Sequence, residues 1–366
     1  MLEHIRLIPL FCFRYGAAPV NVPVSAMKLL AICDPCRYSR PPLDVPTFYR
    51  RAALHPAIHF CHIPVDNVLA QSRHSSTVQV APVAGDLDYD AFLALGSKAH
   101  ESYDLSAFDL VFCRTLKPFP PNYLKQLQRW ENQTQFVNSP TGIEAQIEPE
   151  FLSQATSAFT PEMIVTQNWT KALDFFERHH TVVAKQFNSC GGRGVFKIWG
   201  ENSRFKVDNF TLGLREFADF SQAFAYLQGT TNKPLQFVRY LTRVGAGDKR
   251  VVVVNGEIYG AYVRRSKSGH WINNVSNDGE CFLAAVTETE REAIAGTVEH
   301  YRRRGLMTLG YDFLQDEDGT WRISEINAGN IGGFARLELL TGEPVMDRFL
   351  NWLIQFAESN RQSAVA

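Results

Sequence analysis

The residues best suited to hold a metal ion lie between positions 307 and 330, which read MTLGYDFLQDEDGTWRISEINAGN. Two runs rich in β-branched and aromatic residues, MTLGYDFL and WRISEIN, flank the Asp318-Gly319 step. An Asp-Gly step between such runs predicts a β-hairpin, because a type I′ turn needs positive φ at both central residues. A two-residue turn here would pair Asp312 with Glu325 across the strands. Side chains that face each other in this way have Cβ atoms roughly 5 Å apart.

Two carboxylates this close repel each other unless a cation neutralises them. Asn327 follows Glu325 by two positions, so its side chain projects from the same face of the strand. Two carboxylates and an amide oxygen are hard donors of the kind that Mg²⁺ binds, together with water and phosphate. We therefore expect Asp312, Glu325 and Asn327 to hold Mg²⁺ or Mn²⁺. The alternative is a solvated hairpin with scattered acidic residues, and a register slip of one residue would also remove the site.

A glycine-rich loop, SCGGRG at 189–194, joins two expected strands and follows Lys185. Glycine lets the backbone approach phosphate oxygens and present N–H donors, and a nearby lysine adds a compact positive charge. No helix follows the loop, so it is neither a Walker A loop nor a dinucleotide-binding fingerprint. Phosphate binding is one interpretation of these residues, and an ordinary glycine-rich hairpin tip is the other.

Charged residues also open the strand that begins with Gly247-Asp-Lys-Arg and continues as VVVV. At the rim of a sheet, Arg250 could bind phosphates and Asp248 could accept a hydrogen bond from a ribose hydroxyl, although a solvated strand end is the simpler interpretation. Arg264 and Arg265 follow in the next strand and must face opposite ways. Only one of these two arginines can therefore point into a cleft.

The elements that would position these residues begin with an α/β part. From residue 27 to about 140, the apolar runs KLLAIC, FDLVFCRT and TQFVNS alternate with helical stretches, which favours a parallel sheet with both faces covered. Ligands of such sheets bind beyond the carboxyl ends of the strands, where Asp34 and Arg114 lie. We interpret residues 66–105 as mostly loop with weak helical character.

From about residue 141 the pattern becomes α+β. A helical stretch, NWTKALDFFERHH, precedes the strand TVVAK, and Asn255-Gly256 predicts a second type I′ hairpin between KRVVVV and EIYGAYV. Thr287 and Glu290 have the spacing of a capping box, and the helix that they open leads directly into the acidic hairpin. This order predicts antiparallel ribbons in the second half of the chain.

The overall composition gives no reason to expect nucleic acid or a membrane as a partner. The 366-residue chain is 45% hydrophobic, and 37 Lys and Arg against 38 Asp and Glu give a formal charge of −1. No apolar run reaches the roughly 20 residues of a membrane span. Seven cysteines, including Cys33 and Cys36 of a CxxC motif, do not resemble a disulfide framework. We expect ordinary packing of these thiols in a reducing, cytoplasmic compartment.

Taken together, these residues resemble the bacterial glutathione synthetase family of the ATP-grasp superfamily, and the similarity extends from Met27 onward. It is most specific in TPEMIVT (160–166), in residues 185–194, in YLTRVGAGDKRVVVVNGE (240–257) and in YDFL and ISEIN within 311–327. The resemblance implies a fold of the α/β and α+β classes, with an N-terminal parallel α/β (pre-ATP-grasp) domain followed by a two-subdomain ATP-grasp fold. It also implies an ATP-dependent ligase that joins a carboxylate to an amine through an acylphosphate.

The resemblance assigns roles to individual positions. The implied ATP-binding residues are Lys185, Ser189, Gly191, Gly192, Gly194, Arg239, Tyr240, Leu241, Asp248 and Arg250. Residues 189–194 would form a mobile loop over the phosphates, and main-chain groups of Arg239 and Leu241 would bind the adenine edge. The implied metal ligands are Asp312, Glu325 and Asn327, and the implied catalytic residues are Arg250 and Arg265. Of the two adjacent arginines, the resemblance favours Arg265 as the one that points into the cleft. Arg114, Arg265 and Asn274 would bind substrate; Lys117 is a further candidate, for which an ordinary exposed lysine is the simpler interpretation.

The expected domains are a disordered extension at 1–26 with Met27 as the functional start, an N-terminal domain at 27–140, a central subdomain at 141–235, a C-terminal subdomain at 236–358 and a tail at 359–366. The chain departs from the family in three places. Pro149 stands where an ATP-binding lysine is expected, VSNDG replaces a glycine-rich loop after Asn274, and AGNIGG follows EIN where the synthetases have a substrate-holding turn with Thr, Ser or Pro. The expected reaction joins γ-glutamylcysteine to glycine. An amino-acid ligase acting on another peptide or small molecule, or a degenerate nucleotide-binding module, is the alternative, and a homo-oligomer stays open.

Overall fold

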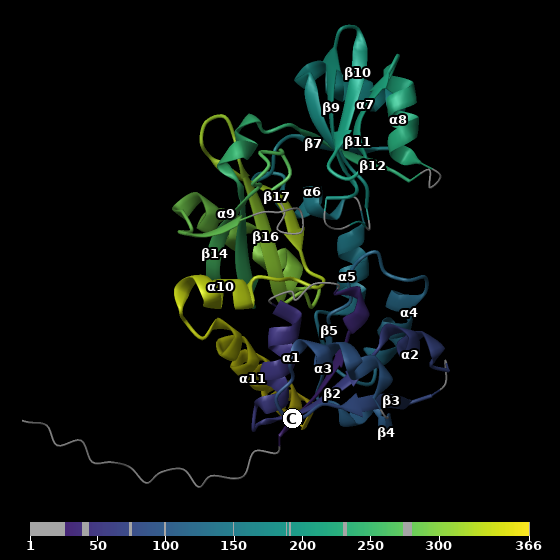
Figure 1. Cartoon of the computed structure of the whole chain (residues 1–366), viewed down its shortest axis with the longest axis vertical. Helices are drawn as coiled ribbons and strands as arrows, with labels where there is room; N and C mark the ends of the chain where they lie inside the picture. The colour runs from purple at the N-terminus through teal and green to yellow at the C-terminus, as the bar shows by residue number, and fades with distance from the viewer. Residues whose placement is uncertain are drawn as a thin grey trace, which may run out of the picture.

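The computed structural model describes residues 26–38, 44–72, 75–98, 100–148, 150–187, 189, 192–229, 233–273 and 280–365. Nearly all of the expected disordered extension lies outside these residues. The described residues form three β-sheets with helices around them (Figure 1). In Figure 1 the N-terminal part lies at the bottom, the central sheet at the top right and the C-terminal sheet at the left. Within the described part of the chain, no helix is long and apolar enough to cross a membrane.

The N-terminal sheet has the strand order β4-β3-β2-β1-β5-β6. Its strands are β1 (Met27–Ile32), β2 (Ile58–Ile63), β3 (Thr77–Pro82), β4 (Glu101–Asp104), β5 (Leu110–Cys113) and β6 (Phe136–Val137). β1 pairs in parallel with β2 and β5, and β5 pairs in parallel with β6, as the apolar runs predicted. Helices α1 (Asp44–Leu54), α2 (Val65–Ala70), α3 (Tyr89–Leu93) and α4 (Tyr123–Trp130) accompany these strands.

The interpretation of residues 66–105 as mostly loop is wrong. This part of the chain contains α2, α3 and the antiparallel strands β3 and β4 at one edge of the sheet. β4 is short and mostly exposed, and only one face of β3 is buried at its start. Edge strands with a solvated face lack the continuous apolar run that marks the central strands.

The central sheet has the strand order β11-β10-β9-β8-β12-β7 and is antiparallel. Helices α5 (Pro140–Ile147) and α6 (Phe151–Thr156) lead into it. Its strands are β7 (Met163–Thr166), β8 (Thr181–Lys185), β9 (Val195–Glu201), β10 (Arg204–Asn209), β11 (Gly213–Phe217) and β12 (Leu235–Arg239). Helix α7 (Trp169–His179), predicted from NWTKALDFFERHH, packs with α8 (Phe220–Gln228) on this sheet.

The C-terminal sheet has the strand order β15-β14-β13-β16-β17 and follows a short 3₁₀ helix, η4 (Thr242–Ala246). Its strands are β13 (Asp248–Val254), β14 (Glu257–Arg265), β15 (Glu280–Ala284), β16 (Thr308–Gln315) and β17 (Trp321–Asn327). Both residues of the predicted Asn255-Gly256 turn have positive φ, at 49° and 87°. The predicted capping box of Thr287 and Glu290 opens α9 (Glu288–Arg302). These two local predictions are confirmed.

The last helices, α10 (Phe334–Thr341) and α11 (Val345–Val365), return to the N-terminal sheet. Phe349 of α11 packs against Phe112 of β5, with ring centroids 5.6 Å apart, in a core that also includes residues of β1, α1 and α10. Figure 1 shows α11 beside α1. α11 continues through the residues expected to be a tail, and Arg361 donates a hydrogen bond to Asp109 at 2.6 Å. The N-terminal domain is therefore anchored to the C-terminal sheet by buried apolar contacts.

Candidate active site

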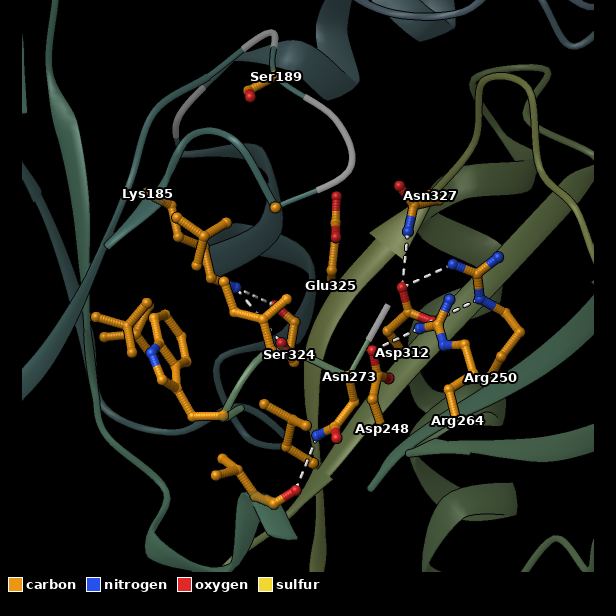
Figure 2. A pocket seen from close by; sticks show the side chains of 18 of the residues that line it. Lys185, Ser189, Asp248, Arg250, Arg264, Asn273, Asp312, Ser324, Glu325 and Asn327 are labelled. Carbon is orange, nitrogen blue, oxygen red and sulfur yellow. Dashed lines mark hydrogen bonds and ion pairs between the residues drawn. The ribbon is translucent and has the colours of Figure 1, made fainter. Parts of the chain in front are cut away.

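A cavity of about 520 Å³ lies where the three parts of the chain meet (Figure 2). Lys117 from the N-terminal part lines the cavity, and the other charged residues on its walls come from the central and C-terminal sheets: Lys185, Arg239, Asp248, Arg250, Arg264, Asp312 and Glu325. A second group of lining residues is apolar or aromatic and comes from β8, β12, η4 and nearby loops: Val183, Val238, Tyr240, Leu241, Val244, Trp271 and Ile272. Such a combination of apolar walls with a few convergent polar groups is typical of small-molecule sites.

The acidic hairpin pairs Asp312 with Glu325, as predicted, but for a different reason. The predicted two-residue turn is wrong. Asp316 N donates to Thr320 O at 2.8 Å, so the last pair of the hairpin is Asp316 with Thr320, and the turn contains the three residues between them. A β-bulge then shifts the register by one residue: Ser324 is the extra residue in β17 between the partners of Asp312 and Phe313. The two departures cancel at Asp312.

Asp312 lies at the centre of a buried ionic cluster (Figure 2). Nε and Nη2 of Arg250 donate to its two oxygens at 2.5 and 2.8 Å, and Nη2 of Arg264 donates to Oδ1 at 2.8 Å. Burial by itself raises the pKa of Asp312, but the two guanidinium groups outweigh it and hold that pKa below its ordinary value. Asp312 is therefore an anion in the folded protein.

Asp248 lies in the same cluster and shares Arg264 with Asp312, at 2.6 Å from Nη2. Burial raises the pKa of Asp248 to about 6, although Arg264 opposes the effect. Its Oδ2 accepts the Arg264 hydrogen bond, whereas its Oδ1 is buried without a hydrogen-bond partner. One oxygen of this carboxylate thus has unused accepting capacity.

The residues expected to bind metal provide a donor set that fits a divalent cation. Among the described residues, no group of three or more His, Cys, Asp or Glu side chains is arranged to hold a metal ion, and this site combines two carboxylates with one amide. Glu325 is exposed to the cavity, and Nδ2 of Asn327 donates to Asp312 at 3.0 Å, which leaves the amide oxygen for another partner. Oxygen donors from carboxylates and an amide are those that Mg²⁺ accepts.

Lys185 ends β8 and reaches across the cavity to the bulge in β17 (Figure 2). Its Nζ donates to the main-chain oxygen of Ser324 at 2.8 Å and lies 3.4 Å from Ser324 Oγ. Burial lowers the pKa of Lys185, and the carboxylate of Glu325 opposes that shift. This contact joins the central sheet to the metal-site strand, and sequence reasoning gave Ser324 no role.

The glycine-rich loop is held by Asn209, which sequence reasoning also missed. Nδ2 of this buried amide donates to the main-chain oxygens of Val195 at 2.9 Å and Arg193 at 3.1 Å, while Oδ1 accepts from Thr211 and Leu212 N–H groups at 3.0 Å. Ser189 and Gly192 line the cavity, whereas Gly194 closes the base of the loop by accepting from Gln186 N. A Cβ on Gly194 would lie 2.7 Å from Ser189 Oγ, so only glycine fits there. Gly191 lies outside the described residues.

The segment expected to read a base, Arg239 to Leu241, lines the cavity where β12 ends. Nη2 of Arg239 donates to Asp316 Oδ2 at 2.7 Å, so its side chain is held at the turn of the acidic hairpin. Tyr240 N donates to Thr181 O at 3.2 Å and so continues the pairing of β12 with β8. The Arg239 guanidinium is thus held by the acidic hairpin, and Arg239 N donates to Glu162 O at 3.0 Å.

The expectation that Arg265 points into the cleft is wrong. Arg265 is exposed, and its Nε donates to Ala246 O at 3.0 Å outside the cavity, whereas Arg264 is buried within the ionic cluster. The reason is a β-bulge in the β13–β14 hairpin, where Val253 pairs with Ile258 but Val252 pairs with Gly260. Without that extra residue, Val263 would lie opposite Asp248; with it, Arg264 does.

Arg114 does not line the cavity either, contrary to its expected role in substrate binding. Its side chain is 2% exposed and donates from Nη2 to Ile331 O at 2.9 Å, behind the segment that follows EIN. Lys117 does line the cavity. Asn274 and Pro149 lie outside the described residues. The neighbouring Asn273, which sequence reasoning did not use, is buried and donates to Val244 O at 2.9 Å.

Comparison with known proteins shows which protein family the sequence of this chain matches. Residues 150–342, more than half of the chain, match the model of the prokaryotic glutathione synthetase ATP-grasp domain. Glutathione synthetase from Brucella melitensis is 27% identical over 249 residues, which are 67% of this chain and 73% of that protein. Glutathione synthetase from Gloeobacter violaceus is 25% identical over 339 residues, covering 90% of this chain and 97% of the other.

The fold is also similar to a solved structure with little sequence identity. D-alanyl-alanine synthetase A from Vibrio cholerae superposes with a TM-score of 0.58 at 13% identity, covering 92% of this chain and 99% of that one. The predicted fold class, an α/β domain followed by a two-part ATP-grasp fold, is thereby confirmed. By the match over 150–342, this chain belongs to the prokaryotic glutathione synthetase family of ATP-grasp ligases, enzymes that form a carbon–nitrogen bond.

Proposed function

We propose that the chain is an ATP- and Mg²⁺-dependent ligase that joins a carboxylate to an amine through an acylphosphate. The observation that carries this proposal is the meeting of Lys185, from the central sheet, with Arg250, Asp312 and Glu325, from the C-terminal sheet, in one cavity. Cations and carboxylates interleaved in this way suit a polyphosphate together with its metal ion.

The binding roles follow from the contacts that remain open. Lys185 and the loop around Ser189 and Gly192 would bind the ATP phosphates, and Arg250 and Arg264 would counter the charge on the transferring phosphoryl group. The hinge at 239–241 would bind adenine through its main chain. Asp248 would accept a ribose hydroxyl with Oδ1, the oxygen that has no partner among the described residues.

Asp312, Glu325 and the amide oxygen of Asn327 would hold the divalent cation. When bound, the cation neutralises phosphate charge during transfer. Because the carboxylate of Asp312 already binds two guanidinium groups, Arg250 and Arg264 fix its orientation before any ligand arrives. The side chain of Glu325 is exposed to the cavity and is therefore free to adjust.

The proposed reaction has two steps. An oxygen of the substrate carboxylate attacks the γ-phosphorus of ATP, and the bond to the ADP oxygen breaks. The amine nitrogen of the second substrate then attacks the acyl carbon, inorganic phosphate leaves and the nitrogen gives up a proton. The protein's contribution is to position the reactants, counter the charge and exclude water, which would otherwise hydrolyse the acylphosphate.

The family favours γ-glutamylcysteine and glycine as the substrate pair. A specific observation favours a second candidate, a ligase that adds an amino acid to another peptide or small molecule. Four residues of the AGNIGG segment after EIN line the cavity: Gly329, Asn330, Ile331 and Gly332. This segment differs from the turn expected in the synthetases, so the acceptor side of the cavity has its own shape.

Phosphate release in the presence of MgATP tests the proposal. Release that requires both γ-glutamylcysteine and glycine supports glutathione synthesis, and release with another pair from a panel of acids and amines supports the second candidate. ATP binding without turnover across the panel would overturn the ligase proposal in favour of a nucleotide-binding module. A Glu325→Gln variant should release no phosphate with any pair and serves as the matched control.

A further inference from the structure

The loop at 266–273, which follows β14, is tied down at both of its ends. Oδ1 of Asn273 accepts a hydrogen bond from Ser266 N at 3.0 Å, and Nδ2 of the same amide donates to Val244 O in η4 at 2.9 Å. Asn273 is 6% exposed. The loop therefore has a fixed base beside the hinge that joins the two ATP-grasp subdomains, and its position is set by buried hydrogen bonds.

The tip of this loop contacts the central subdomain. Nε1 of Trp271 donates to Asp208 Oδ2 in β10 at 2.5 Å, and Nε2 of His270 lies 3.3 Å from the same oxygen. Phe210, which follows β10, packs edge-on against His270 with ring centroids 5.0 Å apart. A hydrogen bond at one edge of an indole restricts its orientation, so Asp208 positions the ring of Trp271.

The Trp271 side chain also lines the cavity, next to the residues expected to surround a nucleoside. Its ring centroid lies 6.4 Å from that of Tyr240 in the hinge, and Leu241, Val244 and Ile272 complete this wall. The five side chains carry no charge, in contrast to the cluster around Asp312. The half-buried indole thus offers an aromatic surface at the apolar side of the cavity.

We infer that Trp271 is a nucleotide-binding residue of this chain, whose indole packs against the nucleoside of ATP, and that Asp208 is the positioning residue that holds it. The inference rests on the proposed function, because it needs ATP in this cavity. Stacking of a base on an aromatic side chain contributes about 1–3 kcal/mol, which corresponds to at least a severalfold effect on affinity. It also follows that nucleotide binding and the contact between the two subdomains support each other.

Calorimetric titration with ATP and with tripolyphosphate, which has no nucleoside, tests this inference in the presence of Mg²⁺. We expect Trp271→Ala to weaken ATP binding about tenfold and to leave tripolyphosphate binding unchanged. Trp271→Phe keeps an aromatic surface without the hydrogen bond and should weaken ATP binding less. Trp169, exposed at the start of α7 and away from the cavity, provides the matched control, and Trp169→Phe should bind both ligands as the unmodified chain does.

Two variants separate positioning from simple structural support. Asp208→Ala should weaken binding of ATP but not of tripolyphosphate, and Asp208→Asn, whose amide oxygen still accepts from the indole, should restore it. Equal losses for ATP and tripolyphosphate, or ATP affinity unchanged in Trp271→Ala, would overturn the inference while leaving the proposed function intact. Failure of the unmodified chain to bind ATP would overturn both.

Discussion

Replacing Arg264 or Arg265 one at a time tests which of these adjacent arginines belongs to the candidate active site. Arg264→Met removes the guanidinium that bridges Asp248 and Asp312, whereas Arg265→Met removes one that is exposed. Both changes keep an unbranched side chain at consecutive positions of β14. Any difference between the two variants therefore reports on which way each side chain faces, not on the propensity of the strand.

The magnitude follows from the groups that Arg264 leaves behind. Asp312 keeps its two bonds to Arg250, but Asp248 loses its hydrogen-bonding partner and stays buried. Breaking a buried ion pair by removing one partner costs about 3–5 kcal/mol. Protonation of Asp248 sets an upper limit, since neutralising a carboxyl of ordinary pKa 3.8 at pH 7.5 costs about 5 kcal/mol.

The raised pKa of Asp248 also determines whether the stability of the variant rises or falls with pH. Burial raises the pKa of Asp248 to about 6, above the 3.8 of the unfolded chain, and removal of Arg264 raises this pKa further. The folded variant then binds a proton that the unfolded chain does not, so its stability falls as pH rises above 3.8. The unmodified chain itself loses about 1 kcal/mol between pH 5.5 and 7.5, so we expect the deficit of Arg264→Met to be about 1–2 kcal/mol smaller at pH 5.5 than at pH 7.5.

Urea denaturation at these two pH values measures the stability, and phosphate release from MgATP measures activity. Arg264→Met should also lose about 10²- to 10³-fold in turnover, as expected for one charge-stabilising donor in an organised site. Arg265→Met should stay within about 0.5 kcal/mol of the unmodified chain. A larger loss of stability or turnover in Arg265→Met than in Arg264→Met would refute the assignment of Arg264 to the site.

Three further predictions address the metal site, the loop and the N-terminal domain. Glu325→Gln should nearly abolish turnover and raise the Mg²⁺ concentration needed for activity, while unfolding stays within about 0.5 kcal/mol because the side chain is exposed; unchanged rates would exclude its role. Asn209→Asp should lower stability by about 2–4 kcal/mol and weaken MgATP binding, because a carboxylate would face the loop carbonyls to which the amide donates. Normal stability of this variant in urea would contradict the prediction. Burial lowers the pKa of His62 to about 3, so the unfolded chain binds a proton first as pH falls below 6.5. About 2 kcal/mol of folding stability should therefore be lost between pH 7.5 and 5.0. In His62→Gln this loss, measured by urea denaturation, should disappear.

The parts of the fold that could be predicted from the sequence are those governed by neighbouring residues. The Asn255-Gly256 turn, the capping box at Thr287 and the helix after Asn168 each depend on a few adjacent side chains. Arg114 was correctly placed at the end of a buried strand, but its surroundings were not predictable. Its hydrogen-bond acceptor, Ile331, comes from a segment more than 200 residues later, so the sequence around Arg114 contains no sign that the side chain is covered.

The orientation of the site residues depends on two β-bulges. The alternation of apolar and polar residues along a strand does not indicate where such bulges occur. In β17 the extra residue is Ser324, and it offsets the longer turn so that Asp312 and Glu325 still face each other. In β14 the extra residue precedes Gly260, and it turns Arg264 instead of Arg265 toward Asp248. A bulge reverses the face of every later residue in its strand, so one unrecognised bulge is enough to select the wrong arginine. Bulges are common next to active sites because they redirect single side chains. Here β14, which supplies Arg264, and β17, which supplies Glu325, each contain one.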